Sequence, residues 1–596
     1  MSDNRQQIQQ SEADRQAALG ISLFSGLTDE DVTQIMNIAE VCDLRAGDML
    51  IKKGEENDCL YFLLSGRLGV FSSLPVSNAS HVYDILPGEV VGEISVLSQV
   101  PRSANVCATR DCRLGKLARD DFMRVAESYP KLLLNLATQI SDRLAFANAA
   151  HTPKRISRIK AVVSLVAEDD LAYWVDVMQR ESRRHGYTAE VVPPRTDRLS
   201  SPELAGYDRY DMTFLVCRDP ESRWSRTCMR QADELDILVP PQPDPAQYRL
   251  LEDLGTSLRG RRITLFRVHE ASTANTEADD RLNKTFGSAN VWNLRSGDAA
   301  HERRLGRIQC NRTLGIVFSG GGAKGCAYIG AIRALRDMHF EFDYVGGCSI
   351  GAVFSGSVLE EYDDAYIEAT SRKAFLSRNP LGDWTVPLVS ISRGNRLTSM
   401  LRMTFGDRLF EQCWIKGFCV ATNLSKGRIE RIDQGRLRLA IRASISLPAL
   451  APPVERNGDI LIDGGLLNNF PVDEMKKMGA DHVLALNLGG QSEWRASFNG
   501  LDPEAPLLRR WRSLHDQEQI PTIGPVLVRS MMLGNNANFE KMRAAADVLI
   551  DIDATEYGLL EFGAMDALIK LGEGKVRQGD VYSQLQDLKE HLRLPH

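Results

Sequence analysis

The chain has 596 residues, 43% of them hydrophobic and 25% charged, an ordinary globular composition that predicts about three or four domains. Its net charge of -7 argues against a nucleic-acid-binding protein, because neutralising phosphates needs a basic surface. Segment 1–15 has no apolar core of the secretory kind, and no apolar run is long enough to span a bilayer. We therefore expect a soluble cytoplasmic protein, or one lying peripherally at the inner face of a membrane.

Changes in residue composition and hydrophobic pattern along the chain predict four parts: a flexible tail at 1–16 and domains at 17–150, 151–310 and 311–596. The eleven cysteines form no CxxC pair and no zinc-type spacing, which predicts reduced, core-filling thiols and no metal site. A homo-oligomer is left open by the sequence.

The first domain begins with short β-type runs that are punctuated by glycines, and helical periodicity follows over Phe122–Ala147. This pattern predicts a β-roll closed by a helix. Within it, the helix start at Glu93 would offer amides to a phosphate, Arg102 could pair with its charge, and Glu93 could accept from a ribose 2′-hydroxyl.

This segment resembles the cyclic-nucleotide-binding domain, and the resemblance implies a regulatory ligand, cAMP or cGMP. The alternative is a degenerate roll that only packs or dimerises. Ser103 does not distinguish the two nucleotides. The implied binding residues are Gly92, Glu93, Ile94, Ser95, Arg102 and Ser103.

The middle domain alternates strand-like runs with helical or polar stretches, which predicts a small α/β layer. Arg195–Asp208 and Ala271–Lys284 are predicted to be exposed loops. No catalytic constellation is evident in this part of the sequence.

The last domain opens with the apolar run Leu314–Phe318, a predicted buried strand, followed by a glycine-rich turn and a helical pattern. Such a turn presents backbone N–H groups to an anion. The turn also satisfies the GxGxxG dinucleotide pattern, but the acid expected at the end of the next strand is missing. A P-loop is disfavoured because Lys324 precedes Gly325 and not Ser or Thr. Lys324 is interpreted as a solvated helix-start residue, with contact to anionic substrate groups as the alternative. The turn contains Gly320, Gly321, Gly322, Lys324 and Gly325.

The next strand ends in Gly347-Cys348-Ser349-Ile350-Gly351, a strand-to-helix turn of GxSxG form. Gly347 and Gly351 allow the tight turn that would lift the Ser349 hydroxyl out of the sheet. Since parallel strands end at one edge, both glycine turns should meet there, and the amides of Gly320–Gly322 could then hold an oxyanion.

A serine nucleophile needs a base, and the predicted strand Asp459–Ile462 runs into Asp463-Gly464-Gly465. No downstream histidine sits on a comparable turn. The residues favour a Ser349–Asp463 dyad over a triad that recruits His339 or His515, or over a structural aspartate in a turn.

These three motifs resemble the oxyanion loop, nucleophile elbow and aspartate motif of patatin-like phospholipases. Ala443–Ala449, Leu467–Val472 and Cys228–Asp233 resemble the neuropathy target esterase-like branch. Cys348 stands where this family often has threonine, and we expect no amino-terminal membrane helix of the kind that the animal members carry.

The resemblance implies a multidomain α/β protein: an N-terminal β-roll, a small middle α/β domain, and a C-terminal α/β hydrolase with a mostly parallel sheet. It implies a serine esterase that acts on lysophospholipids or phospholipids, with no cofactor for catalysis and with cyclic-nucleotide control. The alternative is a cyclic-nucleotide sensor whose hydrolase domain is a non-catalytic lipid-binding or scaffold module.

Two further segments are candidates for lipid contact. Leu507–Leu514 mixes apolar residues with arginines, as interfacial helices do, although packing on its own domain is the alternative. Arg378–Phe410, with Leu381, Trp384, Val386 and Leu388, is a candidate lid over the acyl chain.

Overall fold

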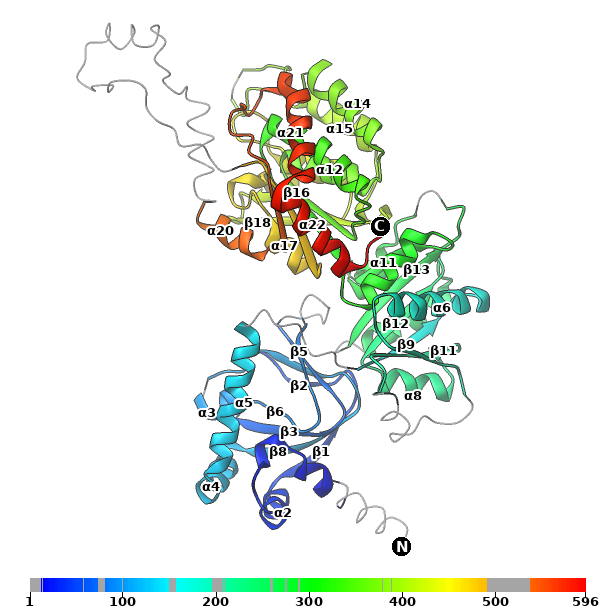
Figure 1. Cartoon of the computed structure of the whole chain (residues 1–596), viewed down its shortest axis with the longest axis vertical. Coiled ribbons are helices and arrows are strands. Elements are labelled where there is room, and N and C mark those ends of the chain that lie inside the picture. Colours follow the sequence, from blue (N-terminus) through cyan, green and yellow to red (C-terminus); the bar gives the residue numbers. More distant parts are fainter. Residues whose placement is uncertain are drawn as a thin grey trace, which may run out of the picture. The chain divides into compact units, whose positions relative to one another are not determined.

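The structure is a computed structural model, and it folds into two compact units (Figure 1): residues 1–273 with 279–309, and residues 274–278 with 310–596. The described residues are 12–595 without 13, 57, 73–80, 99, 149–156, 196–206, 208, 258–260, 274–275, 288–289, 378, 387 and 490–535. The predicted tail at 1–16 and the segment Leu507–Leu514 therefore lie largely or wholly outside the described residues. The domain boundaries at 150 and 310 stay predictions.

The first unit begins with the predicted β-roll. Its strands form two antiparallel four-stranded sheets, ordered β1-β8-β3-β6 and β2-β7-β4-β5. Gly66 and Gly92 adopt positive φ at the turns, where a Cβ would meet backbone atoms at 2.4 and 2.7 Å. The elements are η1 (Ser22–Phe24), α2 (Asp29–Ile38), β1 (Glu40–Leu44), β2 (Met49–Ile51), β3 (Cys59–Ser65), β4 (Leu68–Phe71), β5 (His81–Ile85), β6 (Val90–Val91), α3 (Glu93–Ser98), β7 (Asn105–Ala108), β8 (Cys112–Ala118), α4 (Arg119–Ser128) and α5 (Lys131–Asn148).

The middle region of the same unit is a six-stranded parallel sheet in the order β10-β11-β9-β12-β13-β14. The loop prediction for Ala271–Lys284 is wrong at its end, because Asp279 caps a helix that starts at Asp280. The elements are β9 (Arg158–Ser164), α6 (Glu168–Arg184), β10 (Ala189–Val192), β11 (Met212–Cys217), α8 (Arg223–Gln231), β12 (Glu234–Val239), α9 (Pro245–Ser257), β13 (Arg262–His269), α10 (Asp280–Phe286), β14 (Val291–Arg295) and α11 (Ala299–Gln309).

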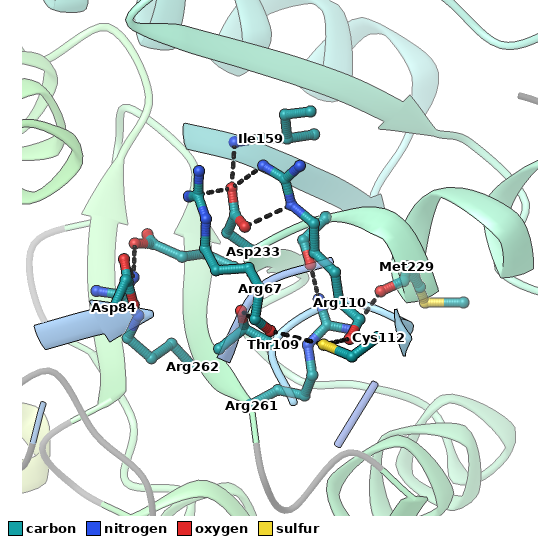
Figure 2. Close-up of polar contacts among 12 residues, drawn as sticks. Arg67, Asp84, Thr109, Arg110, Cys112, Ile159, Met229, Asp233, Arg261 and Arg262 are labelled. Carbon is teal, nitrogen blue, oxygen red and sulfur yellow. Dashed lines mark hydrogen bonds and ion pairs between the residues drawn. The ribbon is translucent and has the colours of Figure 1, made fainter. Parts of the chain in front are cut away.

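Buried ion pairs connect the roll with this sheet (Figure 2). Asp233, at the start of β12, accepts two hydrogen bonds from Arg110 at 2.6 Å each and lies 2.9 Å from Arg67. Arg67 and Arg110 belong to turns of the roll. The two regions of the first unit thus share a charged, solvent-excluded contact.

The second unit is built on a mixed sheet in the order β19-β20-β17-β16-β15-β21-β22, with β18 paired to β17. Strands β17, β16, β15, β21 and β22 are parallel, β18 and β20 run antiparallel to β17, and β19 pairs antiparallel with β20. The strands and longer helices are β15 (Leu314–Phe318), α12 (Ala327–Asp337), β16 (Tyr344–Cys348), α13 (Ile350–Leu359), α14 (Asp364–Arg372), α15 (Asn395–Phe405), β17 (Lys416–Asn423), β18 (Arg428–Ile432), α16 (Leu437–Ser444), β19 (Val454–Arg456), β20 (Asp459–Asp463), α17 (Val472–Met478), β21 (His482–Asn487), α20 (Asn536–Ala545), β22 (Val548–Asp551), α21 (Met565–Arg577) and α22 (Gly579–Leu592). The short helical turns are η4 (Gly322–Cys326), η5 (Lys373–Ser377), η6 (Phe410–Gln412), η7 (Gly464–Leu466) and η9 (Phe562–Ala564).

The sheets confirm the predicted multidomain α/β fold, with an N-terminal β-roll and a mostly parallel sheet in the last domain. Nine of the eleven cysteines are buried, as core-filling residues should be. Among the described helices, none has both the length and the apolar character needed to cross a membrane.

Candidate functional site

Ser349 occupies a sharp turn between β16 and α13, with φ 53° and ψ -124°. The flanking glycines make this turn possible. A Cβ on Gly347 would approach the carbonyl of Gly351 to 2.5 Å, and one on Gly351 would approach the Phe318 carbonyl oxygen to 2.3 Å. The turn raises the Ser349 side chain above the carboxyl end of the parallel strands, as the GxSxG pattern predicts.

Asp463 ends β20 and lies beside this serine. Ser349 Oγ donates to Asp463 Oδ2 at 2.7 Å, and the Gly465 N–H donates to Asp463 Oδ1 at 2.7 Å. The carboxyl is 1% exposed. Burial raises the pKa of Asp463 to about 6, although the hydrogen bonds from Gly465 and Ser349 act in the opposite direction. Its proton affinity therefore lies in the range where a carboxylate can accept a proton near neutral pH.

Two serines on the segment before Asp463 hold the pair in place. The Ser349 N–H donates to Ser444 Oγ at 2.9 Å, and Ser444 Oγ donates to the Val420 carbonyl at 2.6 Å. The Asp463 N–H donates to the Ser446 carbonyl at 2.9 Å. The sequence marked this segment only through its resemblance to a family, because no local spacing links it to Ser349.

The glycine turn after β15 lies against the serine. A Cβ on Gly320 would sit 3.1 Å from the Ser349 Cβ. Gly320 is one of the three predicted oxyanion donors. Its N–H already donates to the Asn469 carbonyl at 3.1 Å, so Gly320 contributes to the shape of the loop instead. The N–H groups of Gly321 and Gly322 donate to no described group, which leaves them as the candidate oxyanion donors.

Two contacts fix the shape of this turn. Asn469 Nδ2 donates to the Gly320 carbonyl at 3.2 Å, and the Ala323 N–H donates to the Leu559 carbonyl at 2.8 Å. Gly322 has φ 60°, and a Cβ there would meet the same Leu559 carbonyl at 2.3 Å. Asn469 is a site residue that single-residue reasoning missed, since it stood out only within a longer family-like stretch.

Lys324 is half-buried one turn into this loop. Burial lowers the pKa of its ammonium group, and the charge of Asp553 partly offsets that effect. Lys324 is thus less exposed to solvent than expected for a lysine that is simply solvated at the start of a helix. The next residue, Gly325, allows a close approach to the helix after the serine, because a Cβ there would meet Ile350 Cγ1 at 2.5 Å.

None of the described histidines hydrogen-bonds to Ser349 or Asp463. His339 follows the end of α12, on the side where β16 begins and not where it ends. His482 opens β21 and lies 3.3 Å from Asp547, against the ring of His591. His515 lies outside the described residues.

The predicted nucleotide site in the roll brings together Gly92, Glu93 and Arg102. Glu93 and Arg102 are 5% and 3% exposed, whereas Ser103 is exposed. Arg102 donates to the carbonyls of Gly92 at 2.9 Å and Cys59 at 2.7 Å. Burial lowers the pKa of Arg102, with nearby acidic groups acting in the opposite direction. The guanidinium therefore already lies beside the start of α3.

Comparisons with known proteins match the two regions of the chain that contain these residues. Residues 316–476 match the family model of patatin-like phospholipases, and residues 41–129 match that of the cyclic nucleotide-binding domain. The chain thus contains both kinds of domain. A solved catabolite activator protein from Thermus thermophilus is 24% identical over 28% of this chain and 68% of that chain, with a TM-score of 0.20.

Several relatives that match more than 90% of this chain have names from one group of proteins. Lysophospholipase nte1 of Aspergillus fumigatus is 25% identical over 93% of this chain and 42% of that protein. Lysophospholipase NTE1 of Yarrowia lipolytica is 27% identical over 93% of this chain and 46% of that protein. An NTE family protein of Mycobacterium tuberculosis is 28% identical over 94% of this chain and 96% of its own length. The chain spans less than half the length of these fungal relatives, and the predicted resemblance to the neuropathy target esterase-like branch is confirmed.

Proposed function

We propose that this protein is a serine esterase that hydrolyses the fatty-acyl esters of lysophospholipids or phospholipids. The observation that carries the proposal is the 2.7 Å hydrogen bond from Ser349 Oγ to the buried carboxylate of Asp463, beside two uncommitted backbone N–H groups. A nucleophile, a base and oxyanion donors are the parts that acyl transfer requires. The lipid substrate class is supported by the names of the fungal relatives and by the patatin-like domain.

In the first half-reaction, Asp463 Oδ2 takes the proton of Ser349 Oγ as that oxygen attacks the ester carbonyl carbon. The carbonyl oxygen becomes an oxyanion and accepts hydrogen bonds from the N–H groups of Gly321 and Gly322, each worth about 3 kcal/mol in comparable sites. The tetrahedral intermediate then collapses. Asp463 returns the proton to the departing alcohol, and the acyl group remains on Ser349.

In the second half-reaction, water replaces the alcohol. Asp463 accepts a proton from the water as its oxygen attacks the acyl-enzyme carbonyl, and the same donors hold the second oxyanion. Collapse releases the fatty acid, and the proton goes back to Ser349 Oγ. Since Asp463 alone transfers protons in both halves, its ionised form is required at the start of each.

The test compares Ser349→Ala and Asp463→Asn with the parent chain on lysophosphatidylcholine. We expect each change to lower kcat by at least about 1,000-fold, because removing a nucleophile or its base typically has that effect. Ser357→Ala, on the same helix α13, is the control and should retain activity. Unchanged hydrolysis by Ser349→Ala would end the proposal.

A fluorophosphonate probe separates the esterase from the alternative, a cyclic-nucleotide sensor with a non-catalytic lipid-binding or scaffold domain. An activated Ser349 should be labelled in the parent chain and unlabelled in Ser349→Ala. Parent protein that resists the probe but binds lipid would favour the scaffold.

We also propose that cAMP or cGMP binds the roll and alters this activity. The support is the family match over residues 41–129 and the burial of Glu93 and Arg102 beside the start of α3. Arg102 would exchange a carbonyl partner for the cyclic phosphate. In calorimetric titrations of the full chain, Arg102→Gln should weaken nucleotide binding by about 10- to 100-fold, since hydrogen bonds between charged groups are worth about 1.5–3 kcal/mol. The exposed Arg124→Gln serves as the control. No binding of either nucleotide to the parent chain would contradict this part.

A further inference from the structure

Four large apolar side chains stand in solvent on one loop of the second unit. The loop spans residues 383–394, of which 387 lies outside the described residues, and precedes α15; its exposed members are Trp384, Val386, Leu388 and Val389, at 63%, 72%, 89% and 69%. Exposed apolar clusters of this kind often mark interaction surfaces, whereas apolar side chains scattered singly over a surface are normal.

Hydrogen bonds between the two ends of the loop hold it in a defined conformation. Trp384 pairs with Ser392 in an antiparallel bridge, and the Thr385 N–H donates to the Ile391 carbonyl at 2.9 Å. Asp383 accepts hydrogen bonds from Ser392 Oγ at 2.5 Å and from the Asn395 N–H at 2.8 Å, at the start of α15. The two ends of the loop thus pair like a short hairpin that includes Trp384, and Val386, Leu388 and Val389 lie between the paired ends.

The paired ends of the loop are also hydrogen-bonded to a segment near the proposed active site. The Ile391 N–H donates to the Ala449 carbonyl at 2.8 Å, and the Ser392 N–H donates to the Leu450 carbonyl at 3.1 Å. Three residues before Ala449, the Ser446 carbonyl accepts the Asp463 N–H. The loop thus adjoins the segment that positions the proposed base.

We propose that the 383–394 loop docks the hydrolase domain on a phospholipid surface, with Trp384, Val386, Leu388 and Val389 entering the boundary between headgroups and acyl chains. Tryptophan favours this depth, and aliphatic side chains gain from leaving water there. Arg393 and Arg396 are exposed at the base and would lie near the headgroups, so anionic lipid should strengthen docking. The inference rests on the proposed lipid esterase function, since it assigns the route by which that site reaches its substrate.

The test measures binding in the Ser349→Ala background, so that hydrolysis cannot alter the vesicles. The triple variant Val386→Ser/Leu388→Ser/Val389→Ser is compared with its parent by co-sedimentation with vesicles of phosphatidylcholine mixed with phosphatidylglycerol. We expect the triple variant to bind at least about tenfold more weakly, because three side chains lose most of their transfer free energy. Vesicles of phosphatidylcholine alone should bind both proteins more weakly.

A matched pair of single variants controls for the loss of any exposed leucine. Leu388→Ser changes the loop, and Leu134→Ser makes the same change on α5, where Leu134 is 66% exposed. Only Leu388→Ser should weaken vesicle binding. With Ser349 intact, both variants should hydrolyse a short-chain, water-soluble ester at the parent rate.

Three outcomes would overturn the inference. The triple variant could bind vesicles as its parent does, it could convert a dimer to a monomer in size-exclusion chromatography, or, when made with Ser349 intact, it could lose turnover of the soluble ester. The second result would assign the loop to contact between copies, and the third to the acyl site. Because binding is measured without catalysis, a protein that docks but hydrolyses nothing would contradict the esterase proposal alone.

Discussion

Asp463, the proposed base, has a raised pKa, and this gives the proposed esterase a defined pH dependence. Burial raises the pKa of the carboxyl to about 6. The base must be ionised before it can accept the Ser349 proton, so activity should rise as pH increases through about 6 and level off above it. The profile of kcat/KM against pH for a water-soluble ester measures this value in the free enzyme. A profile that is flat from about pH 5 to pH 8 would show that Asp463 is not the titrating base.

Asn469 holds the proposed oxyanion loop through two hydrogen bonds to Gly320. Its side-chain amide donates to the Gly320 carbonyl, and its own carbonyl accepts the Gly320 N–H. Asn469→Ala removes the first contact and keeps the second, so Gly321 and Gly322 should be held less firmly. We expect kcat to fall about 10-fold with little change in KM, because oxyanion contacts form mainly in the transition state.

The neighbouring residue supplies the control for this prediction. Asn468 Nδ2 donates to Asp473 in the first turn of α17 and makes no contact with the glycine loop. Asn468→Ala should therefore retain kcat. Equal losses in the two variants would indicate a general loosening of the segment and contradict a specific role for Asn469.

At the scale of single residues, the sequence predicted the side chains whose motifs are local. Ser349 lies in a five-residue pattern, and Asp463 ends a strand before two glycines, so each could be recognised without knowledge of its partner. Asn469 and Ser444 could not be assigned roles in this way. They reach the site across 149 and 95 residues of chain, and such contacts leave no periodic signal in sequence.

At the scale of elements, helices α12 and α21 pack with their backbones almost in contact (Figure 1). A Cβ on Gly572 would lie 1.9 Å from the Ala327 carbonyl oxygen, and one on Gly330 would lie 1.9 Å from the Ile569 carbonyl oxygen. Neither atom belongs to a flexible side chain that could move aside. The glycines thus set the distance between the two helices, and α12 begins directly after the glycine loop.

Gly572→Ala should therefore destabilise the second unit, by about 1–3 kcal/mol as overpacked cores commonly do. Gly574→Ala lies on the same helix, where a Cβ would meet nothing within 4 Å, and should stabilise it by up to about 1 kcal/mol through helix propensity. Thermal unfolding of the two variants measures these opposite shifts. Shifts of the same sign would contradict close helix packing as the cause.

The sequence predicted elements well where a buried strand ended in a distinctive turn, as for β15, β16 and β20. The edge strands β10 and β14 have weaker signals, because they are short and carry polar residues within their runs. The sequence pattern placed the start of α10 in a loop, although Asp279 carries an N-cap signal that its side chain fulfils. Edge strands and short helices depend on tertiary contacts more than on their own periodicity.

At the scale of the first unit, buried charge joins the roll to the middle sheet. Asp233 is 0% exposed and is reached by Arg110 and Arg67 from the roll, and its second carboxylate oxygen also accepts the Ile159 N–H at 2.8 Å (Figure 2). Burial alone would raise the pKa of Asp233, but the two guanidinium groups outweigh it and hold the pKa below its ordinary value. No sequence pattern predicted this contact, because Arg110 and Asp233 are 123 residues apart.

Arg261 extends the same interface from the middle region. It is 2% exposed and donates to the carbonyls of Met229 and Ala232, in the turn that carries Asp233. The turn is therefore fixed from its own side by Arg261 while Asp233 receives the roll. This arrangement predicts that the two regions of the first unit unfold together, with Asp233 as the centre of a contact that also includes the Arg262–Asp84 ion pair at 3.9 Å.

Asp233→Ala tests this coupling, because it leaves Arg67 and Arg110 without the carboxylate that compensates their charge. Removing one partner of a buried ion pair costs about 3–5 kcal/mol, whereas the exposed pair of Asp176 with Arg180 should contribute about 0.5 kcal/mol or less. Urea unfolding should therefore show a large loss for Asp233→Ala and almost none for Asp176→Asn. Hydrogen exchange should also become faster in β7 and β12 together, since each would lose the other's support. A stability loss confined to β12, with the roll unaffected, would show that Asp233 serves only its own sheet.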